Sequence, residues 1–330
     1  MKAIVVSELS GPSAARLQHV PEPEGAHRRA EGRRLLVEVH AVGLSFIDPL
    51  QTRGQYQSGV EAPYVAGSEL AGVVVEAPGN SWLRPGDRVA GIVWQGAMAE
   101  RALALEDYLI RIPESMDHVH AAGLYMNYST AWYALESSRV QPGGTVLVTG
   151  AAGGVGTAVL DIARAQGIST IALVSSDEKE RVAVASGADH VLRSTGHWLD
   201  DVKTLTDGHG VQGFIDMVGG SGFLDTVRAL AIGGTGVIVG FAGGSIPEIK
   251  VNRLLLRNLT LTGIAMDVME REHPGTLKRV RNGVQGLLDA GSLHPAVERV
   301  YRLDQAAEAL ASLENRTAVG KVVLMVKDEQ

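Results

Sequence analysis

The sequence contains no cysteine among its 330 residues, which excludes disulfide bonds, thiolate nucleophiles, iron–sulfur clusters and cysteine-bound zinc. It also lacks any apolar run approaching the roughly 18 residues of a membrane-spanning helix. No apolar segment of about 7–15 residues, as a secretory signal needs, follows Met1. A basic excess is missing too, because the net charge is −7, which argues against a nucleic-acid partner. We therefore expect a cytoplasmic protein without membrane or nucleic-acid partners.

Glycine, by contrast, is abundant. The chain has 40 glycines, whereas average usage would give roughly 23. This excess indicates many tight turns and close backbone approaches, as in α/β nucleotide-binding folds. Apolar residues make up 45%, and the length favours about two domains.

The pattern of elements changes near residue 120. Residues 1–110 predict short strands between turns, at Lys2–Val6, Arg34–Val42, Leu70–Glu76 and Arg88–Val93, with a turn at Arg84–Asp87. Beyond a predicted helix at Ala121–Ser137, strands alternate with helices, beginning with Thr145–Thr149, Val155–Gln166, Thr170–Val174 and Asp177–Ser186. Such alternation predicts βαβ units and a parallel sheet. A mixed tail follows residue 265.

The stretch Val146–Gly156 joins an apolar strand to a glycine-rich turn and a helix. Within it, Ala151-x-Gly153-x-x-Gly156 fits the dinucleotide-binding fingerprint, with Ala151 in place of the first glycine. Gly153 lets the backbone approach a pyrophosphate, Gly156 lets helix and strand pack closely, and the helix N-terminus supplies N–H groups. Because a second strand follows the helix, we predict a dinucleotide site.

The end of that second strand indicates which dinucleotide binds. An NAD site usually places Asp or Glu there to accept from the ribose 2′-OH, whereas this chain has Ser175 and Ser176. Lys179 follows one helical turn later and Arg193 follows the third strand, where both can reach a 2′-phosphate. The acidic residues after Ser176 oppose this interpretation, but such residues commonly cap and begin helices. We predict NADPH.

Seven segments in order resemble the medium-chain dehydrogenase/reductase superfamily, and within it the zinc-free quinone oxidoreductases (the zeta-crystallin-like family). They are Ala41–Asp48, Arg53–Tyr56, Pro63–Gly72, Pro85–Val89, Asn127–Trp132, Ala151–Gly156 and Gly320–Leu324. The resemblance implies an α/β protein with a GroES-like β-rich catalytic domain, a Rossmann domain with a doubly wound parallel sheet, and a cleft between them. It implies boundaries at 1–122 for the GroES-like domain, 123–265 for the NADPH-binding domain and 266–330 for the return to the first.

The zinc-dependent branch of this superfamily binds its catalytic metal through cysteine and the His of a Gly-His-Glu motif. Here Gly67-Ser68-Glu69 carries serine at the His position, and cysteine is absent. Two other His-containing segments, His118-x-His120 and His197 near Asp200, are better explained as surface or capping residues. We therefore expect no metal, and a reduction that depends on cofactor positioning and hydrogen bonds.

The resemblance also implies the residues of the site. Tyr56 and Ser45 are expected to donate hydrogen bonds to a substrate oxygen, and Thr130 to contact the nicotinamide. Ser45 replaces the usual Asn, while Asn127 and Tyr128 replace small residues and narrow the pocket. The implied cofactor-binding set is Ser45, Asn127, Thr130, Ala152, Gly153, Gly154, Val155, Ser175, Ser176, Lys179, Arg193, Val218, Gly240, Phe241 and Lys321.

Three functions follow from this resemblance. The first is NADPH-dependent hydride transfer to a small-molecule quinone. The second is reduction of an activated alkene, either an enoyl-thioester or an alkenal, in which Tyr56 would supply a proton. The third is non-catalytic NADPH binding, since a fold does not fix a function. We also expect a homodimer through the apolar segment Thr235–Phe241, interpreted as an edge strand.

Overall fold

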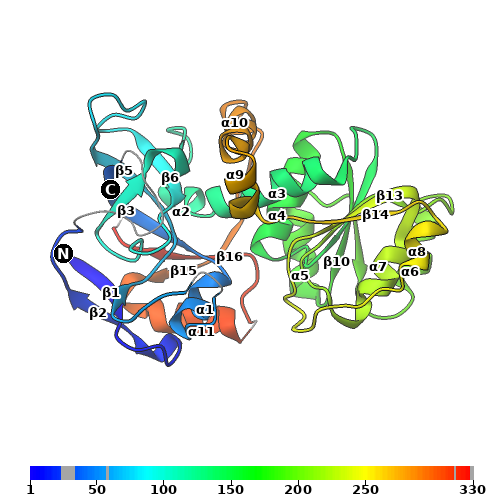
Figure 1. The fold of residues 1–330 in the computed structure, drawn as a ribbon, viewed down its shortest axis with the longest axis horizontal. Coiled ribbons are helices and arrows are strands. Elements are labelled where there is room, and N and C mark those ends of the chain that lie inside the picture. Colours follow the sequence, from blue (N-terminus) through cyan, green and yellow to red (C-terminus); the bar gives the residue numbers. More distant parts are fainter. Residues whose placement is uncertain (24–33, 57–58, 316, 328–330) are drawn as a thin grey trace. The chain divides into compact units, whose positions relative to one another are not determined.

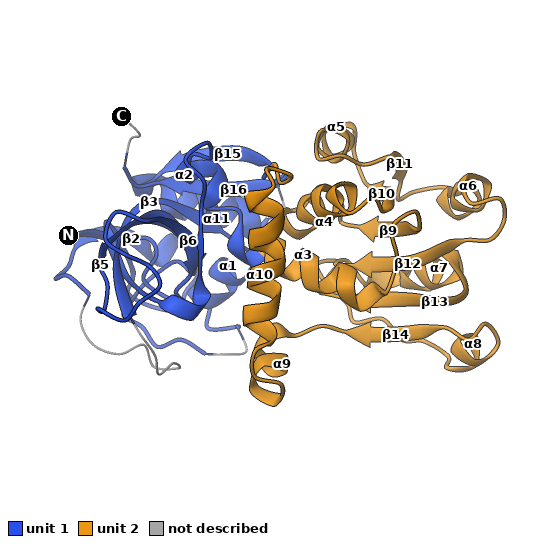
Figure 2. Cartoon of the chain, turned by 90° about the horizontal axis from the view of Figure 1, so that it is seen from above, with its two compact units in different colours: residues 1–126, 295–330 blue, residues 127–294 orange. Residues whose placement is uncertain are grey.

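The computed structural model describes residues 1–23, 34–56, 59–315 and 317–327. The chain forms two compact units (Figure 2). Unit 1 comprises Met1–Met126 and Pro295–Gln330, and unit 2 comprises Asn127–His294. The chain therefore leaves unit 1 after Met126 and returns to it at Pro295.

Unit 1 consists mainly of strands (Figure 1). In its described residues, a seven-stranded sheet has the order β15-β16-β3-β5-β6-β8, with β7 also paired to β3, and a three-stranded sheet has the order β2-β1-β4. The strands are β1 Lys2–Val6, β2 Ala15–His19, β3 Arg34–Leu44, β4 Tyr64–Val65, β5 Glu69–Glu76, β6 Arg88–Ile92, β7 Arg101–Leu105, β8 Leu109–Arg111, β15 Val297–Arg302 and β16 Lys321–Met325. The helices are η1 Pro12–Ala14, α1 Ile47–Thr52, η2 Glu106–Tyr108, α2 His118–Ala121, η4 Leu303–Gln305 and α11 Ala306–Glu314.

Strand β3 shows why this sheet forms. Leu35, Val37 and Val39 are fully or almost fully buried, while the residues between them are half-buried, which is the period of two that a strand imposes. Near its end, Gly43 allows a close approach, because a Cβ there would lie 1.8 Å from the carbonyl oxygen of Ala122. Strand β3 therefore packs its alternating apolar side chains into the core of unit 1.

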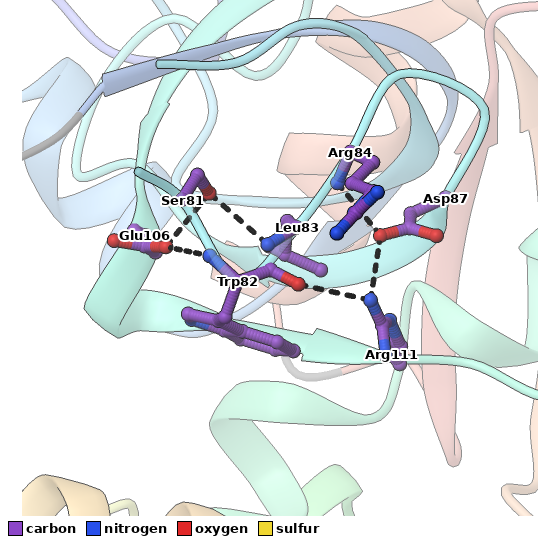
Figure 3. A network of polar contacts seen from close by, with 7 residues as sticks. All are labelled: Ser81, Trp82, Leu83, Arg84, Asp87, Glu106 and Arg111. Atoms are coloured by element: carbon purple, nitrogen blue, oxygen red, sulfur yellow. Dashed lines mark hydrogen bonds and ion pairs between the residues drawn. The ribbon is translucent and has the colours of Figure 1, made fainter. Parts of the chain in front are cut away.

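The predicted turn at residues 84–87 is held by polar contacts (Figure 3). Asp87 accepts from the backbone N–H of Arg84 at 2.8 Å and from the Arg111 guanidinium at 2.9 Å. Arg111 also donates to the carbonyl of Trp82 at 3.0 Å and lies over its ring, 5.3 Å from the centroid. The buried Glu106 accepts from the backbone of Trp82 at 2.7 Å. The turn is thereby fixed at both ends, and β6 follows it directly.

Unit 2 contains a parallel sheet in the order β11-β10-β9-β12-β13-β14, six strands in its described residues. This is the order 3-2-1-4-5-6 of a doubly wound dinucleotide-binding fold. The strands are β9 Thr145–Thr149, β10 Ser169–Val174, β11 His190–Arg193, β12 Val211–Asp216, β13 Leu230–Ile238 and β14 Thr260–Gly263. The helices are α3 Tyr125–Ser138 (from Asn127 in unit 2), α4 Gly154–Ala165, α5 Asp177–Ala185, α6 Trp198–Leu205, η3 Gly220–Gly222, α7 Phe223–Ala229, α8 Asn252–Leu255, α9 Met266–Glu272 and α10 Thr276–Asp289.

The sheet order fixes where a ligand can bind. The order of the strands reverses between β9 and β12, and ligands of such sheets bind at the carboxyl ends of the strands beside this point. Thr149 ends β9 and Asp216 ends β12. The central β9 is buried on both faces, with Val146, Leu147 and Val148 fully buried, as expected for a covered parallel strand.

Two expectations from the sequence are wrong in detail. Segment Thr235–Phe241 is not an edge strand, because β13 lies between β12 and β14. The edge on that side of the sheet is β14. Its four residues, which alternate threonine with leucine and glycine, are too few to predict a strand from the sequence. The helix expected at Ala121–Ser137 is α3, which begins later, at Tyr125; the short helix α2 ends at Ala121.

Candidate functional site

The glycine-rich turn of unit 2 joins the end of β9 to the start of α4. Gly150 has a positive φ of 62°, and Gly153 is the residue before α4. A Cβ on Gly156 would lie 2.3 Å from the carbonyl oxygen of Gly150, so glycine alone allows the helix to start this close to the strand. The N-terminus of α4 carries no acidic side chain in its first turn. The turn fits the pyrophosphate of a dinucleotide.

Helix α3 supplies a second wall to this turn. The side chain of Asn127 is buried against Gly154, where a Cβ would meet its Nδ2 atom at 2.7 Å. Thr130 is half-buried one turn further along α3; Ala152 lies in the turn itself and Val155 in the first turn of α4. The structure thus brings Asn127 to the glycine-rich turn.

After β10, three residues expected to select the cofactor, Ser175, Ser176 and Lys179, lie together at the start of α5, which we call the corner. Ser176 precedes α5, and its hydroxyl accepts from the backbone N–H of Lys179 at 3.3 Å. The ammonium of Lys179 donates to the hydroxyl of Ser175 at 3.1 Å. One positive charge and two hydroxyls therefore lie together at the place where the ribose 2′ substituent of a dinucleotide binds in this fold.

Arg193 ends β11 next to the same helix, but its charge is already paired. Its guanidinium forms ion pairs with Asp177 and Glu180 of α5. The Asp177 side chain is 99% exposed, so this contact can be exchanged for another anion at little cost. Arg193 therefore lies close to the corner formed by Ser175 and Lys179 with two competing carboxylates.

The loop after β12 is held by Asp216, which is 1% exposed. Its carboxylate accepts from the hydroxyl of Thr149 and from the backbone N–H groups of Val218 at 3.1 Å and Gly219 at 3.0 Å. Gly219 has a positive φ of 64°. The carboxyl ends of β9 and β12 are thereby tied together at the switch point of the sheet.

The loop after β13 is bonded to the loop after β12. The backbone N–H of Val239 donates to the carbonyl of Asp216 at 2.8 Å, and that of Gly243 donates to the carbonyl of Val218 at 2.8 Å. Phe241 is 42% exposed and lies beside Gly219, where a Cβ would meet its ring at 3.0 Å. The expected contacts Val218, Gly240 and Phe241 therefore belong to one pair of interlocked loops.

Tyr128 is engaged inside unit 2. Its hydroxyl donates to Asp161 Oδ2 at 2.7 Å, and Asp161 also accepts from the backbone N–H of His294 at 2.6 Å and pairs with Arg164 at 2.5 Å. Burial, reinforced by the nearby Asp161 carboxylate, raises the pKa of Tyr128 well above its ordinary value. The phenol therefore remains a protonated donor that fastens α3 to α4.

Unit 1 contains a buried ion pair between β16 and β5. The Lys321 ammonium lies 2.6 Å from Glu69 Oε2, and the two side chains are 3% and 0% exposed. The second carboxylate oxygen of Glu69 accepts from the backbone N–H of Met126 at 2.8 Å. Burial raises the pKa of Glu69, and the Lys321 charge opposes that rise. Lys321 also donates to Ser45 Oγ at 3.2 Å.

Asp48 connects the two serines of this cluster. Its Oδ2 accepts from the backbone N–H of Ser45 at 2.7 Å, and its Oδ1 accepts from the hydroxyl of Ser68 at 2.9 Å. Burial raises the pKa of Asp48 to about 6, although these two hydrogen bonds lower it. Ser45 itself is half-buried. We call Ser45, Asp48, Ser68, Glu69 and Lys321 the polar cluster.

The polar cluster does not suit zinc. Ser68, at the position of the family's ligand histidine, gives its hydroxyl to Asp48, and a serine hydroxyl is not among the usual zinc ligands. Over residues 1–23, 34–56, 59–315 and 317–327, no group of three or more His, Asp or Glu side chains has a metal-binding arrangement. Tyr56, the other expected donor, is half-buried and follows Gly54, whose φ is 64°.

Sequence reasoning missed Asp48 and Glu69 as buried charges. The Ser45-x-x-Asp48 spacing carries a weak signal, because a side chain three residues on commonly accepts from a preceding N–H. The pairing of Glu69 with Lys321 has no local signal, since 252 residues separate them. Lys321 was expected at the cofactor, which stays a prediction; in the structure it donates to Ser45 and Glu69.

Comparison with known proteins places the chain in a family. Two family models match it, the alcohol dehydrogenase GroES-like domain over residues 31–114 and the zinc-binding dehydrogenase over residues 154–282. Rat quinone oxidoreductase-like protein 2 is 38% identical over 331 residues, covering 99% of this chain and 92% of the relative. The chain therefore belongs to the medium-chain dehydrogenase/reductase superfamily.

Solved structures narrow this placement. A probable oxidoreductase from Mycobacterium abscessus has a TM-score of 0.87 at 36% identity, with 99% of both chains covered. The quinone oxidoreductase of Thermus thermophilus, solved alone and with NADPH, has a TM-score of 0.80 at 32% identity, covering 99% of this chain and all of that one. The expected similarity to zinc-free quinone oxidoreductases and the expected GroES-like and Rossmann fold are confirmed. The protein is an oxidoreductase of the quinone oxidoreductase type.

No helix in the described parts of the chain is both long and apolar enough to cross a membrane.

Proposed function

We propose that this protein transfers hydride from NADPH to a quinone without a metal ion, and that it does so in the cytoplasm. The observation that carries the proposal is the polar cluster. It offers a half-exposed hydroxyl, Ser45, backed by a buried ammonium, and it has a serine where a zinc enzyme needs a ligand. Hydrogen bonds to an oxygen that gains charge are sufficient for a quinone, because its ring becomes aromatic on reduction.

The residues of unit 2 fit the cofactor. The glycine-rich turn would hold the pyrophosphate at the N-terminus of α4, and Asn127 and Thr130 would lie on the neighbouring helix. The interlocked loops with Val218, Gly240 and Phe241 lie at the carboxyl ends of β12 and β13, where the nicotinamide half of a dinucleotide belongs in this fold. NADPH, when bound, supplies the hydride.

An acceptor screen tests the reaction. NADPH oxidation is measured with a benzoquinone, phenanthrenequinone, an alkenal and an enoyl-CoA, each over a range of concentrations. We expect the quinones to have the highest kcat/KM. A higher kcat/KM for the alkenal or the enoyl-CoA would favour the alkene reductase, and tight NADPH binding without turnover of any acceptor would favour a non-catalytic protein.

Tyr56→Phe separates the two reductase functions. An alkene reductase needs a proton donor at the carbon next to the one that receives hydride, so the loss of this hydroxyl would lower alkene reduction strongly. Quinone reduction needs no such donor, and we expect its kcat to change by less than about threefold. Tyr301→Phe is the control, because Tyr301 is a half-buried tyrosine on β15 of the same unit. A selective loss of quinone turnover in Tyr56→Phe would contradict the proposal.

The preference for NADPH is proposed to depend on Lys179. A charge-assisted hydrogen bond contributes about 1.5–3 kcal/mol, so Lys179→Ala should lower kcat/KM for NADPH at least about tenfold. The kcat/KM for NADH should stay unchanged. Lys203→Ala is the control, because Lys203 is a half-exposed lysine on α6 that pairs with Asp200. Equal losses with both cofactors would argue against a phosphate contact.

We also propose a homodimer through the edge strand β14. The described segment before it carries four aliphatic side chains that are at least 74% exposed, namely Ile246, Val251, Leu255 and Leu256. An unpaired strand edge beside such a surface is typical of an interface between protein chains. Helix α8, which contains Leu255, lies next to β14 (Figures 1 and 2).

Light scattering after size exclusion tests the dimer. We expect wild type to elute as a dimer and the variant Leu255→Asp with Leu256→Asp to elute as a monomer. Val184→Asp, on α5, is the control for an exposed aliphatic residue elsewhere on unit 2. A wild type that is monomeric at micromolar concentration would contradict this proposal.

A further inference from the structure

The lysine of the polar cluster is bonded on two sides. Lys321 Nζ donates to Glu69 Oε2 at 2.6 Å and to Ser45 Oγ at 3.2 Å, and the lysine is 3% exposed. Burying an ammonium is costly unless it is paired, and Glu69 supplies that pairing. A short contact between ammonium and carboxylate is typical of an ionised pair. The second bond joins the buried Lys321 to the half-buried Ser45.

The direction of the second bond is fixed by chemistry. An ammonium group has three donors and no acceptor, so Ser45 Oγ must accept from Lys321. The proton of the Ser45 hydroxyl is therefore left to donate elsewhere. In the described residues this hydroxyl proton has no acceptor. The other hydrogen bonds of Ser45 are made by its backbone: its N–H donates to Asp48 Oδ2, and its carbonyl accepts from the N–H of Asp48.

The backbone of Ser45 is also held in place. Its N–H donates to Asp48 Oδ2 at 2.7 Å, and Asp48 is fixed in turn by Ser68 at 2.9 Å. Asp48 and Ser68 are 2% and 0% exposed, whereas Ser45 is half-buried. The cluster thus holds one hydroxyl donor, on the half-buried Ser45, over a buried support, and such preorganisation stabilises a developing negative charge.

We propose that Lys321 acts through Ser45 as a fixed positive charge, so that the Ser45 hydroxyl donates a strengthened hydrogen bond to the quinone oxygen that becomes negative. This inference depends on the quinone reduction proposed above. Hydride leaves the nicotinamide with both electrons of its C–H bond and forms an O–H bond at one quinone oxygen. The opposite oxygen gains the negative charge, and a proton from solvent completes the hydroquinone. Ser45 and Lys321 keep their protons, and Lys321, bonded to Glu69 and Ser45, acts as a positioning residue.

The test compares the loss of the Ser45 hydroxyl with and without the lysine charge. Ser45→Ala is made in wild type, which keeps the ion pair, and in a Glu69→Gln, Lys321→Met protein, which lacks both charges. The second background removes both charges of the pair together, because an unpaired buried carboxylate would destabilise the fold. Circular dichroism and Tm confirm folding before kinetics are measured.

We expect Ser45→Ala to lower kcat for the quinone by on the order of 100-fold or more when Lys321 is charged. In the background without the charge, the same substitution should lower kcat by less than about threefold. The Kd of NADPH, measured by fluorescence titration, should stay within about twofold in all four proteins. Equal kcat losses in the two backgrounds would overturn the inference. A large rise in the NADPH Kd confined to the Lys321→Met proteins would overturn it too, since such a rise indicates that Lys321 contacts the cofactor directly.

A second comparison needs no change at Lys321. Ser45→Thr keeps the hydroxyl and should retain most of kcat, whereas Ser45→Ala should lose it. A kcat loss in Ser45→Thr as large as that in Ser45→Ala would contradict the inference even if the doubly substituted pair fails to fold. Wild type without quinone turnover would refute the proposed function itself, whereas turnover that is indifferent to Ser45 refutes this inference alone.

Discussion

Replacing Asp48 by Asn removes an ionisable group from the interior of unit 1 while keeping its shape. The amide oxygen of Asn can accept from the backbone N–H of Ser45, and its NH2 group can donate to the hydroxyl of Ser68. The variant can therefore make two hydrogen bonds in place of the two that the wild-type carboxyl makes at 2.7 and 2.9 Å. The main change is the loss of a titrating proton.

The sign of the pH effect follows from the raised pKa. Burial raises the pKa of Asp48 from 3.8 to about 6, so the folded protein holds this proton more tightly than the unfolded chain. The contribution to stability is fully present below the unfolded pKa and is lost as pH rises toward about 6. Two pKa units correspond to about 3 kcal/mol in total. Between about pH 4.5 and about pH 7.5, the linkage relation gives a loss of about 2 kcal/mol.

The assay is urea unfolding of wild type and Asp48→Asn at these two pH values. The unfolding free energy of the variant minus that of wild type should rise by about 2 kcal/mol from the lower to the higher pH. Asp304→Asn is the control, because Asp304 is half-exposed and pairs with Arg302 at the surface. Its difference from wild type should change little over the same range. A pH-independent difference for Asp48→Asn, or a slope of opposite sign, would refute the argument from burial.

Two further predictions concern unit 2. Gly156→Ala should raise the NADPH Kd at least about tenfold by calorimetry, because its Cβ would lie 2.3 Å from the carbonyl oxygen of Gly150 and the turn must shift; an unchanged Kd would contradict this. Tyr128→Phe should lower the unfolding free energy by about 1–3 kcal/mol in urea, since it leaves the buried Asp161 short of one donor, while the NADPH Kd stays the same. A loss of affinity without a loss of stability would show that Tyr128 has a different role.

The fold of unit 2 could be predicted because its signals are local. The alternation of apolar strands with helices gives the parallel sheet, and the spacing of Gly153 and Gly156 marks the turn at the start of α4. Both features are set by neighbours within one βαβ unit. Strand β14 escaped prediction because Thr260–Gly263 has only four residues. Its place at the edge depends on pairing with β13, which no short window of sequence contains.

Ser45 and Lys321 were named as site residues from the sequence, but the ion pair that joins Lys321 to Glu69 escaped prediction for a related reason. Nothing local to Lys321 indicates that it is buried. Its burial is tolerable because Glu69 pairs with it, and strand β16 pairs antiparallel with β3 in a register that sets Val322 opposite Leu44. That pairing brings Lys321 to Ser45, 276 residues away in sequence. A lysine in such a place costs free energy that an apolar residue would not cost. Its position behind the half-exposed Ser45 is therefore better explained by the chemistry of the site than by the stability of unit 1.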